Sequence, residues 1–262
     1  MAHAPDLSIV IPAYNEAARL EGTLREIVSY CRKHHQAFEL ILVDDGSRDE
    51  TSSVARRLSR ELPELRLVRL AANHGKGYAV RAGVLNAVGT RVLFADADGS
   101  TSIAEIERLE AALESGADVA IGSRALHAAG IRVEARLYRR LIGRTFHRLV
   151  EWLADAGVKD TQCGFKLFRS SVAQDLFSRM RMNGYSFDVE VLLMARRRGY
   201  RIAEVPVNWF HKPGSKVRLT VDSFQMAMDL FRIRGNWLRG EYDSPHLGPC
   251  PQNLQASPPL SS

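Results

Sequence analysis

The feature that most constrains the fold is an alternation, in the first half of the chain, of short apolar runs with longer stretches of helical periodicity. Four strand-sized runs are predominantly apolar: Leu7–Ile11, Phe38–Val43, Leu65–Leu70 and Arg91–Ala95. The stretches that follow them predict helices at Glu16–Lys33, Ser47–Glu61, Gly77–Ala87 and Ile103–Glu114. Buried strands separated by helices predict an α/β fold with a mostly parallel sheet that helices cover on both faces. Ser47 and Glu50 have the spacing of a capping box, so we expect a helix to open there.

The second half of the chain is less regular. Strands are expected at Phe165–Phe168 and Ile202–Val207, and helices at Ile131–Leu153, Phe187–Arg198 and Leu219–Leu238. The first of these helices is strongly basic. From Asp243 the chain is rich in Pro, Ser and Gly and has no periodicity, which is typical of disorder. We therefore expect one domain, residues 1–242, a C-terminal amphipathic helical region within it, and a disordered tail, residues 243–262.

Composition narrows the class of protein only a little. The 262 residues are 45% hydrophobic and 25% charged, which is typical of a globular enzyme-sized domain, and the net charge of +6 fits an anionic partner. Three cysteines without metal-like spacing favour reduced thiols. The N-terminus does not resemble a signal peptide, and no apolar run reaches the roughly 20 residues that span a bilayer. We expect a cytoplasmic protein, soluble or peripheral at the cytoplasmic face of a membrane.

Polar clusters follow all four predicted strands of the first half, where each strand ends. They are Pro12–Glu16, Asp44–Ser47, Asn73–Gly77 and Asp96–Gly99. In an open parallel sheet, ligands bind in the crevice at the carboxyl ends of the strands. Because these four clusters would line one crevice, their convergence indicates a ligand site more strongly than any one motif does.

Two aspartates, Asp96 and Asp98, come directly after a buried strand. Carboxylate oxygens are the ligands that Mg²⁺ or Mn²⁺ prefers, and a bound diphosphate would complete the shell. The alternative is a solvated acidic turn in which Gly99 makes the bend. The neighbouring polar strand ends favour the metal site.

The other clusters suggest nucleotide contacts. Asp44 and Asp45 could accept hydrogen bonds from the base or ribose of a nucleotide, or could simply form a turn and a helix cap. The segment Asn73–Gly77 places Lys76 and two glycines before a helix, where backbone N–H groups could meet a phosphate. It lacks the spacing of a Walker motif.

Taken together and in order, these segments resemble the family 2 glycosyltransferases. The matching segments are IVIPAYNEAARL, LILVDDGSRDET, NHGKGYAVRAG, LFADADGS and AIGSR. In the second half, DTQCGFKLF (160–168), FDVE (187–190), EVPVNW (204–209) and GSKV (214–217) are similar to the dolichyl-phosphate glucosyltransferase branch. Polyprenyl-phosphate mannosyltransferases are close relatives. The resemblance covers Leu7–Tyr242 and implies a GT-A fold, Rossmann-like in its sheet.

The resemblance also implies roles for individual residues. Contacts to the nucleotide-sugar would come from Pro12, Tyr14, Glu16, Asp44, Asp45, Lys76, Asp96, Gln162 and Lys166. The metal would be held by Asp96 and Asp98. Catalytic roles fall to Asp98, Arg124, Asp160 and Lys216, and Asp188 and Glu190 would line the sugar and acceptor region. Ser215 and Lys216 would close over the site from a mobile loop.

The chemistry that these residues predict is inverting transfer of a sugar, with glucose from UDP-glucose favoured, to a polyprenyl phosphate. A phosphate monoester acceptor is largely ionised at neutral pH, so it needs little help from a base. It does need positive charge, which Arg136 and its neighbours in the basic stretch could supply while also contacting a membrane surface. Two departures stand out: Ser100 replaces the Gln of many mannosyltransferases, and no membrane helix is found.

Other functions remain open from the sequence. The donor could be GDP-mannose, or the acceptor could carry a hydroxyl group, in which case Asp160, Asp188 or Glu190 could serve as the base. A non-catalytic nucleotide-sugar binder is a further alternative, which the intact aspartate pair argues against. The basic balance also suggests nucleic acid, but no recognition motif supports that reading.

Overall fold

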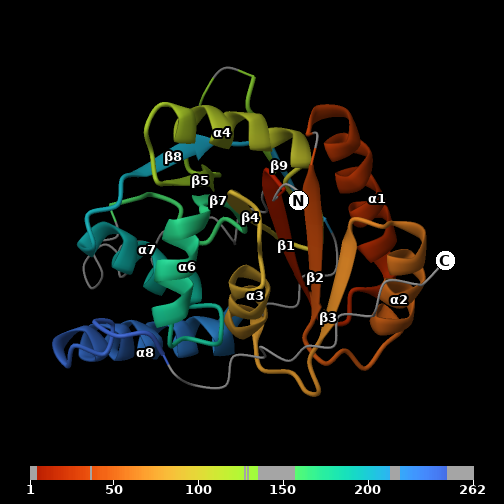
Figure 1. Ribbon diagram of the computed structural model, residues 1–262. Coiled ribbons are helices and arrows are strands. Elements are labelled where there is room, and N and C mark those ends of the chain that lie inside the picture. Colours follow the sequence, from red (N-terminus) through yellow and green to blue (C-terminus); the bar gives the residue numbers. More distant parts are fainter. Residues whose placement is uncertain are drawn as a thin grey trace.

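A single mixed sheet forms the centre of the molecule (Figure 1). The computed structural model describes residues 5–35, 37–126, 128, 130–134, 157–212 and 219–246. Seven strands pair in the order β3-β2-β1-β4-β7-β5-β8. All neighbours are parallel except β7, which runs antiparallel to both β4 and β5. The predicted α/β fold with a mostly parallel sheet is therefore confirmed, with one reversed strand.

The strands occur close to where the apolar runs predicted them. They are β1 Leu7–Ala13, β2 Phe38–Asp44, β3 Leu65–Arg69, β4 Arg91–Ala95, β5 Val119–Ser123, β7 Phe165–Arg169 and β8 Ile202–Pro206. Two short strands, β6 Val133–Glu134 and β9 Trp209–Phe210, pair beside the main sheet. The strand β5 was not predicted, although its sequence is apolar and buried throughout.

Helices cover both faces of the sheet. They are α1 Ala17–His34, α2 Thr51–Glu61, α3 Lys76–Leu85, the 3-10 turn η1 Ile103–Glu105, α4 Ile106–Glu114, α6 Ser170–Arg179, α7 Phe187–Arg197 and α8 Leu219–Leu238. The helix α6 was not predicted. Within the described residues, no helix combines the length and the apolar character needed to cross a lipid bilayer.

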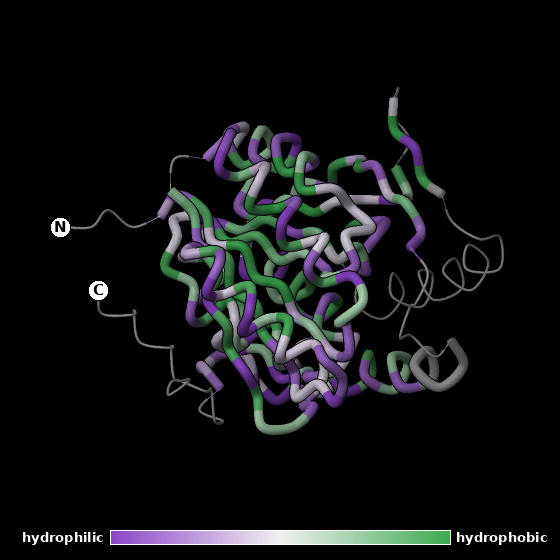
Figure 2. Tube along the Cα trace, turned by 90° about the vertical axis from the view of Figure 1, so that its right-hand side faces the viewer, coloured by the Kyte–Doolittle hydropathy of each residue, from purple (hydrophilic) through white to green (hydrophobic). Residues whose placement is uncertain are grey.

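The alternation of side chains along each strand divides the core into two layers. Val10 and Phe94 point to one layer, with α3, α6, α7 and the end of α8. Ile9 and Leu93 point to the other layer, with α1, α2 and α4. Figure 2 shows the hydrophobic trace concentrated in the central strands and the hydrophilic trace along the outer turns. Burial on both faces explains why the strand sequences read as continuous apolar runs.

The capping-box prediction is wrong, because α2 begins at Thr51 and its N-cap residue, Glu50, makes no side-chain capping hydrogen bond. Ser47 instead accepts a hydrogen bond from the Asn15 N–H at 3.0 Å, and its own N–H donates to Asp44. Ser47, Arg48 and Asp49 all bond to Asn15, so the loop before α2 holds the loop that follows β1. Tertiary hydrogen bonds therefore took the place of the local cap.

Two predictions about the second half are only partly covered by the described residues. The expected basic helix Ile131–Leu153 begins instead with the strand β6, which pairs with Trp209–Phe210; the rest of that stretch lies outside the described residues. Of the expected tail, 243–246 make hydrogen bonds to the body, including His246 N–H to Ser178 O at 2.7 Å. The remaining tail also lies outside the described residues, so its disorder stays a prediction.

Candidate functional site

The loops that follow β1, β2, β4 and β5 all leave the sheet at one edge. Parallel pairing brings Ala13 opposite Asp44 at the ends of β1 and β2. The antiparallel strand β7 begins at this edge, with Phe165 opposite Ala95. The topology therefore gathers four strand ends and the loop before β7, which carries Asp160 and Gln162, at one edge of the sheet; the sequence predicted this convergence for β1, β2 and β4 but not for β5.

Asp96 and Asp98 lie in the turn after β4. One oxygen of Asp98 accepts the Ser100 N–H at 2.8 Å, and the left-handed φ of +61° at Gly99 allows the chain to bend there. The Asp96 side chain is 36% exposed and lines a pocket with Thr23, Glu26 and Thr101. Asp96 is thus held at a hollow of the surface, and Asp98, which is half-buried, follows it in the same turn.

Two lysines lie behind the aspartate pair. Lys76, at the start of α3, places its Nζ 2.8 Å from Asp96 Oδ1. Lys166 on β7 is buried and binds Asp188 Oδ1 at 2.5 Å. Both ammonium groups lie over the ring of Phe94, at 5.2 and 5.8 Å from its centroid. Burial opposes the charge of Lys76, but Asp96 and Asp188 raise its pKa, so it stays an ammonium group.

Lys166 therefore does not lie where a ligand could contact it. Its Nζ also donates to the carbonyl of Cys163, so it joins β7, α7 and the loop before β7. The sequence-based expectation that Lys166 contacts the nucleotide-sugar directly does not agree with this burial. An ammonium group that is already bound to a carboxylate and a carbonyl holds the crevice in shape instead.

Arg124, just after β5, forms a bidentate ion pair with Asp160. The guanidinium Nε and Nη2 atoms donate to the two carboxylate oxygens at 2.7 and 2.8 Å, and the Arg124 N–H donates at 2.9 Å. Burial raises the pKa of Asp160, but the Arg124 guanidinium outweighs it and leaves the pKa below its ordinary value. The N–H of Asp160 itself donates to Glu204 on β8. The pair thus fixes the loop before β7 against β5 and β8.

Asp44 and Asp45 use their oxygens within the protein. Asp44 is fully buried and accepts the N–H of Ser47 and the hydroxyl of Ser52. Asp45 accepts the N–H groups of His74 and Gly75 at 2.8 and 2.9 Å. Burial raises the pKa of Asp45, and these two donors offset part of that rise. Both residues shape the crevice, and their contact with a nucleoside stays a prediction.

The end of β1 supplies the remaining predicted nucleotide contacts. Pro12 is buried in the strand, whereas Tyr14 is half-buried in the loop that follows. Asn15 adopts a left-handed φ of +55° and accepts the Arg48 N–H, which fixes this loop against the one after β2. Glu16 pairs with Arg19, whose guanidinium is also attracted by Asp96 and Asp98.

Other predicted residues are less fully placed. Gln162 is half-buried, its Nε2 atom is buried without a hydrogen-bond partner among the described residues, and its contact with the nucleotide-sugar stays a prediction. Arg136, Ser215 and Lys216 lie outside the described residues, and their roles stay predictions. Glu190, which the resemblance placed beside the sugar and acceptor, points instead toward the segment 181–182.

Gly164 is a site residue that the sequence analysis did not single out. A Cβ atom on it would lie 2.0 Å from Asp96 Oδ2, and its carbonyl accepts the Asp96 N–H at 3.0 Å. Any side chain there would displace the carboxylate. The glycine within the Gln162–Phe165 segment was the available signal, but the close approach between β4 and β7 is visible only in the fold.

Comparison with known proteins agrees with this geometry. The model of the family "Glycosyl transferase family 2" matches residues 8–177. The dolichyl-phosphate beta-glucosyltransferase of Saccharomyces cerevisiae is 38% identical over 257 residues, covering 90% of this chain and 76% of the relative. The dolichyl-phosphate beta-glucosyltransferase of Homo sapiens is 39% identical, and the match covers 90% of this chain and 77% of the relative.

Solved structures share the fold. The glucosyl-3-phosphoglycerate synthase of Mycobacterium tuberculosis in complex with phosphoglyceric acid superimposes with a TM-score of 0.67 at 21% identity, over 88% of this chain and 80% of that one. The same enzyme with Mn²⁺, UDP and glucosyl-3-phosphoglycerate gives a TM-score of 0.62 at 20% identity. The match covers 93% of this chain and 82% of that one. At these identities the likeness concerns the fold.

The fold and the aspartate pair at the carboxyl edge of its sheet define a glycosyltransferase of the GT-A class. The match of the family model over most of the chain, and the relatives above one-third identity, specify the family. The chain belongs to glycosyltransferase family 2.

Proposed function

We propose that this glycosyltransferase moves glucose from UDP-glucose to a polyprenyl phosphate, with inversion at the anomeric carbon. The relatives that cover most of the chain are dolichyl-phosphate beta-glucosyltransferases, and this supports both the sugar and the acceptor. The observation that carries the proposal is the arrangement at the carboxyl edge. There, Asp96 lies beside Lys76, Asp98 follows in the same turn, and the carboxylates considered as a base are already bound.

The donor would lie across the ends of β1, β2 and β4. The loop after β1, held by Asn15, would contact the nucleoside, and Asp45 keeps the backbone around His74 and Gly75 in place beside it. Lys76 would offset phosphate charge. The oxygen of the acceptor would form a bond to the anomeric carbon as the bond to the diphosphate breaks on the opposite side.

Asp96 and Asp98 fit a divalent cation, Mg²⁺ or Mn²⁺. Their oxygens are hard ligands, and among the described residues no three His, Cys, Asp or Glu side chains are grouped to hold a metal by themselves. A two-carboxylate site of this kind needs further oxygens, which a donor diphosphate supplies. The ion would neutralise the leaving diphosphate. The Mn²⁺ and UDP in the fold neighbour agree with this assignment.

The engaged carboxylates favour an acceptor that is already ionised. Asp160 has both oxygens on Arg124, Asp188 is buried against Lys166, and Glu190 binds backbone N–H groups and Tyr242. A hydroxyl acceptor requires a base that can take its proton. A phosphate monoester, with a second pKa near ~6, carries its negative charge at neutral pH. The described part of the site thus suits a phosphate acceptor better than a hydroxyl acceptor.

An assay with paired substrates tests this function. The full chain is incubated with UDP-glucose or GDP-mannose, with a short polyprenyl phosphate or the matching polyprenol, and with Mg²⁺ or Mn²⁺. We expect a glucosyl lipid only from UDP-glucose and the phosphate, and no product after chelation. Transfer to the polyprenol, or from GDP-mannose at an equal rate, would contradict the proposed substrate pair.

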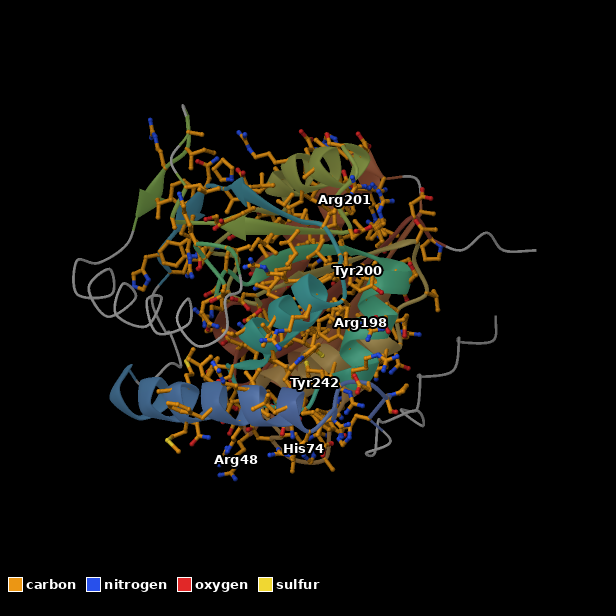
Figure 3. All side chains as sticks on the ribbon, turned by 90° about the vertical axis from the view of Figure 1, so that its left-hand side faces the viewer. Arg48, His74, Arg198, Tyr200, Arg201 and Tyr242 are labelled. Carbon is orange, nitrogen blue, oxygen red and sulfur yellow. The ribbon has the colours of Figure 1, made fainter. Side chains whose placement is uncertain are left out.

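We also assign membrane contact to one face of α8. Three of its apolar side chains are exposed: Met228 by 44%, Phe231 by 53% and Leu238 by 78%. Their spacing places them on one side of the helix, and the exposed Arg232, Arg234 and Arg239 flank them. Apolar side chains with flanking arginines suit the headgroup region of an anionic bilayer. Figure 3 shows α8 along the lower border of the molecule.

Liposome flotation tests this face. The wild-type chain should float with anionic vesicles and less with neutral ones, and Phe231→Ser should reduce the bound fraction severalfold. Val88→Ser is the matched control, because Val88 is 59% exposed but belongs to the turn before β4, where its N–H donates to Glu39 on β2. Equal binding by wild type and Phe231→Ser, or equal loss in the control, would remove α8 from the contact.

A further inference from the structure

The residues that follow α8 do not leave the body but contact the C-terminal end of α6 and the middle of α3. We call Glu241–His246 the C-terminal strap. Its backbone is held by arginines: Arg81 donates to the carbonyl of His246 at 3.0 Å, and Arg179 donates to the carbonyls of Tyr242 and Asp243. Arg181 donates to the carbonyl of Glu241. Three cations on backbone carbonyls thus fix the path of this segment.

Within the strap, Tyr242 is buried and carries the main side-chain contact. Its hydroxyl donates to Glu190 on α7 at 2.7 Å, and its ring packs against Trp237 near the end of α8. Glu190 is fully buried. It also accepts the N–H groups of Arg181 at 3.1 Å and Met182 at 2.8 Å. One carboxylate therefore joins the strap to the segment 181–182.

The next residue, Asn183, touches the loop that holds Lys76. Its carbonyl accepts the N–H of Tyr78 at 3.2 Å. A Cβ atom on Gly75 would lie 2.5 Å from this carbonyl oxygen, and one on Gly77 would lie 2.6 Å from the carbonyl oxygen of Met182. The segment 181–183 and the Lys76 loop, residues Asn73–Gly77, are thus in direct backbone contact. Movement of one would require movement of the other.

We propose that the C-terminal strap positions the Lys76 loop for the donor diphosphate, with Tyr242 and Glu190 as positioning residues that act through Arg181–Asn183. The role of the loop rests on the proposed function, whereas the contact between the strap and the loop stands on the distances above. Because the strap follows α8 directly, it also connects the proposed membrane face to the donor side of the crevice.

Removing one hydroxyl group tests the proposal in the full chain. Tyr242→Phe deletes the hydrogen bond to Glu190 and keeps the ring. We expect the KM for UDP-glucose to rise about three- to tenfold, while kcat and the KM for the acceptor stay within about twofold of wild type. Hydrogen exchange of the Tyr78 amide should become faster, since its acceptor Asn183 is less firmly held.

Tyr200→Phe is the matched control. The Tyr200 hydroxyl donates to Asp175 at 2.9 Å, so the variant loses the same type of bond, but it lies near the other end of α7. Figure 3 labels both tyrosines on the same side of the molecule. The control should keep the wild-type KM for the donor and the wild-type exchange of Tyr78, even where its melting temperature falls as much.

The outcomes separate the strap from the proposed function. An unchanged donor KM in Tyr242→Phe, or an equal rise in Tyr200→Phe, would overturn the positioning role. If the wild type does not use UDP-glucose at all, the proposed function fails. Hydrogen exchange of the Tyr78 amide then tests whether the strap holds the Lys76 loop. Faster exchange in Tyr242→Phe alone would uphold the link, and unchanged exchange would overturn it.

Discussion

Two sets of carboxylates meet at the same edge of the sheet, and the fold treats them differently. Asp96 and Asp98 lie in one turn, Asp96 at a hollow of the surface, and the protein uses only part of their hydrogen-bonding capacity. Asp160, Asp188 and Glu190 are buried and bound to Arg124, Lys166 and backbone N–H groups. We call the first pair the accessible set, because it can receive a ligand. We call Asp160, Asp188 and Glu190 the engaged set, because they hold the loops that form the crevice. Acidic residues of similar sequence context thus divide into a pair that we propose binds a ligand and a set that supports the surrounding loops.

The largest loss of activity should come from a substitution in the accessible set. Asp98→Ala removes a proposed cation ligand, and we expect glucosyl transfer to fall by about a thousandfold or more, because the charge on the leaving diphosphate is then not offset. Steady-state assays over a range of Mn²⁺ concentrations measure this. The melting temperature should stay near that of wild type, since Asp98 is not buried. Wild-type rates in the variant would show that the open aspartate pair has no role in the reaction.

An intermediate effect is expected from Asp160. If its role is to hold Arg124, then Asp160→Asn and Arg124→Met should each lower kcat/KM by roughly thirtyfold, and the double variant should be no worse than the single variants. A double-mutant cycle with UDP-glucose measures this coupling. Additive losses would show that the two residues act separately.

The same cycle distinguishes the structural role of Asp160 from that of a base. A base would impose a lower limit on the pH profile of kcat that Asp160→Asn abolishes and Arg124→Met leaves in place. We expect no such difference between the variants. Finding it would move Asp160 into the accessible set and would favour a hydroxyl acceptor.

The sequence could predict the accessible set because that set depends on local pattern. Asp96 and Asp98 follow an apolar run directly, and parallel strands place their ends at one edge whatever the details of the packing. The fold class followed from the same runs. What periodicity did not reveal was the direction of β7, since Phe165–Phe168 is equally apolar in either orientation.

The engaged set could not be predicted because its partners are distant in the sequence. Asp188 meets Lys166 across 22 residues, and Glu190 meets Tyr242 across 52. Local rules even misled at Ser47, where a capping pattern gave way to a bond with Asn15, which is 32 residues away. The family resemblance implied ligand contacts for Lys166 and Glu190, whereas the structure shows both side chains buried and bound within the protein.

The smallest expected effect is on the pH dependence of the free energy of unfolding, and it comes from the ionisation of Glu190. Burial raises its pKa to about 7 from an ordinary value of 4.5, despite the donors around it. Between these two pH values, Glu190 holds a proton in the folded chain that it has lost in the unfolded chain. Its contribution to the free energy of unfolding is therefore complete below about pH 4.5 and is lost as the pH rises through about 7. The shift corresponds to roughly 3 kcal/mol at most.

Glu190→Gln removes that titration and should flatten this part of the pH dependence. Urea unfolding of wild type and variant at pH 5 and pH 7.5 measures the free energy of unfolding, and the wild type should lose more of it over this interval than the variant does. Other shifted groups, such as His35 and His246, whose lowered pKa gives the opposite slope, cancel in the difference between the two proteins. An identical pH dependence in both proteins would mean that the Glu190 carboxylate stays ionised across this range. The hydrogen bonds from Tyr242, Arg181 and Met182 would then outweigh burial, and the engaged set would be held by full charges throughout.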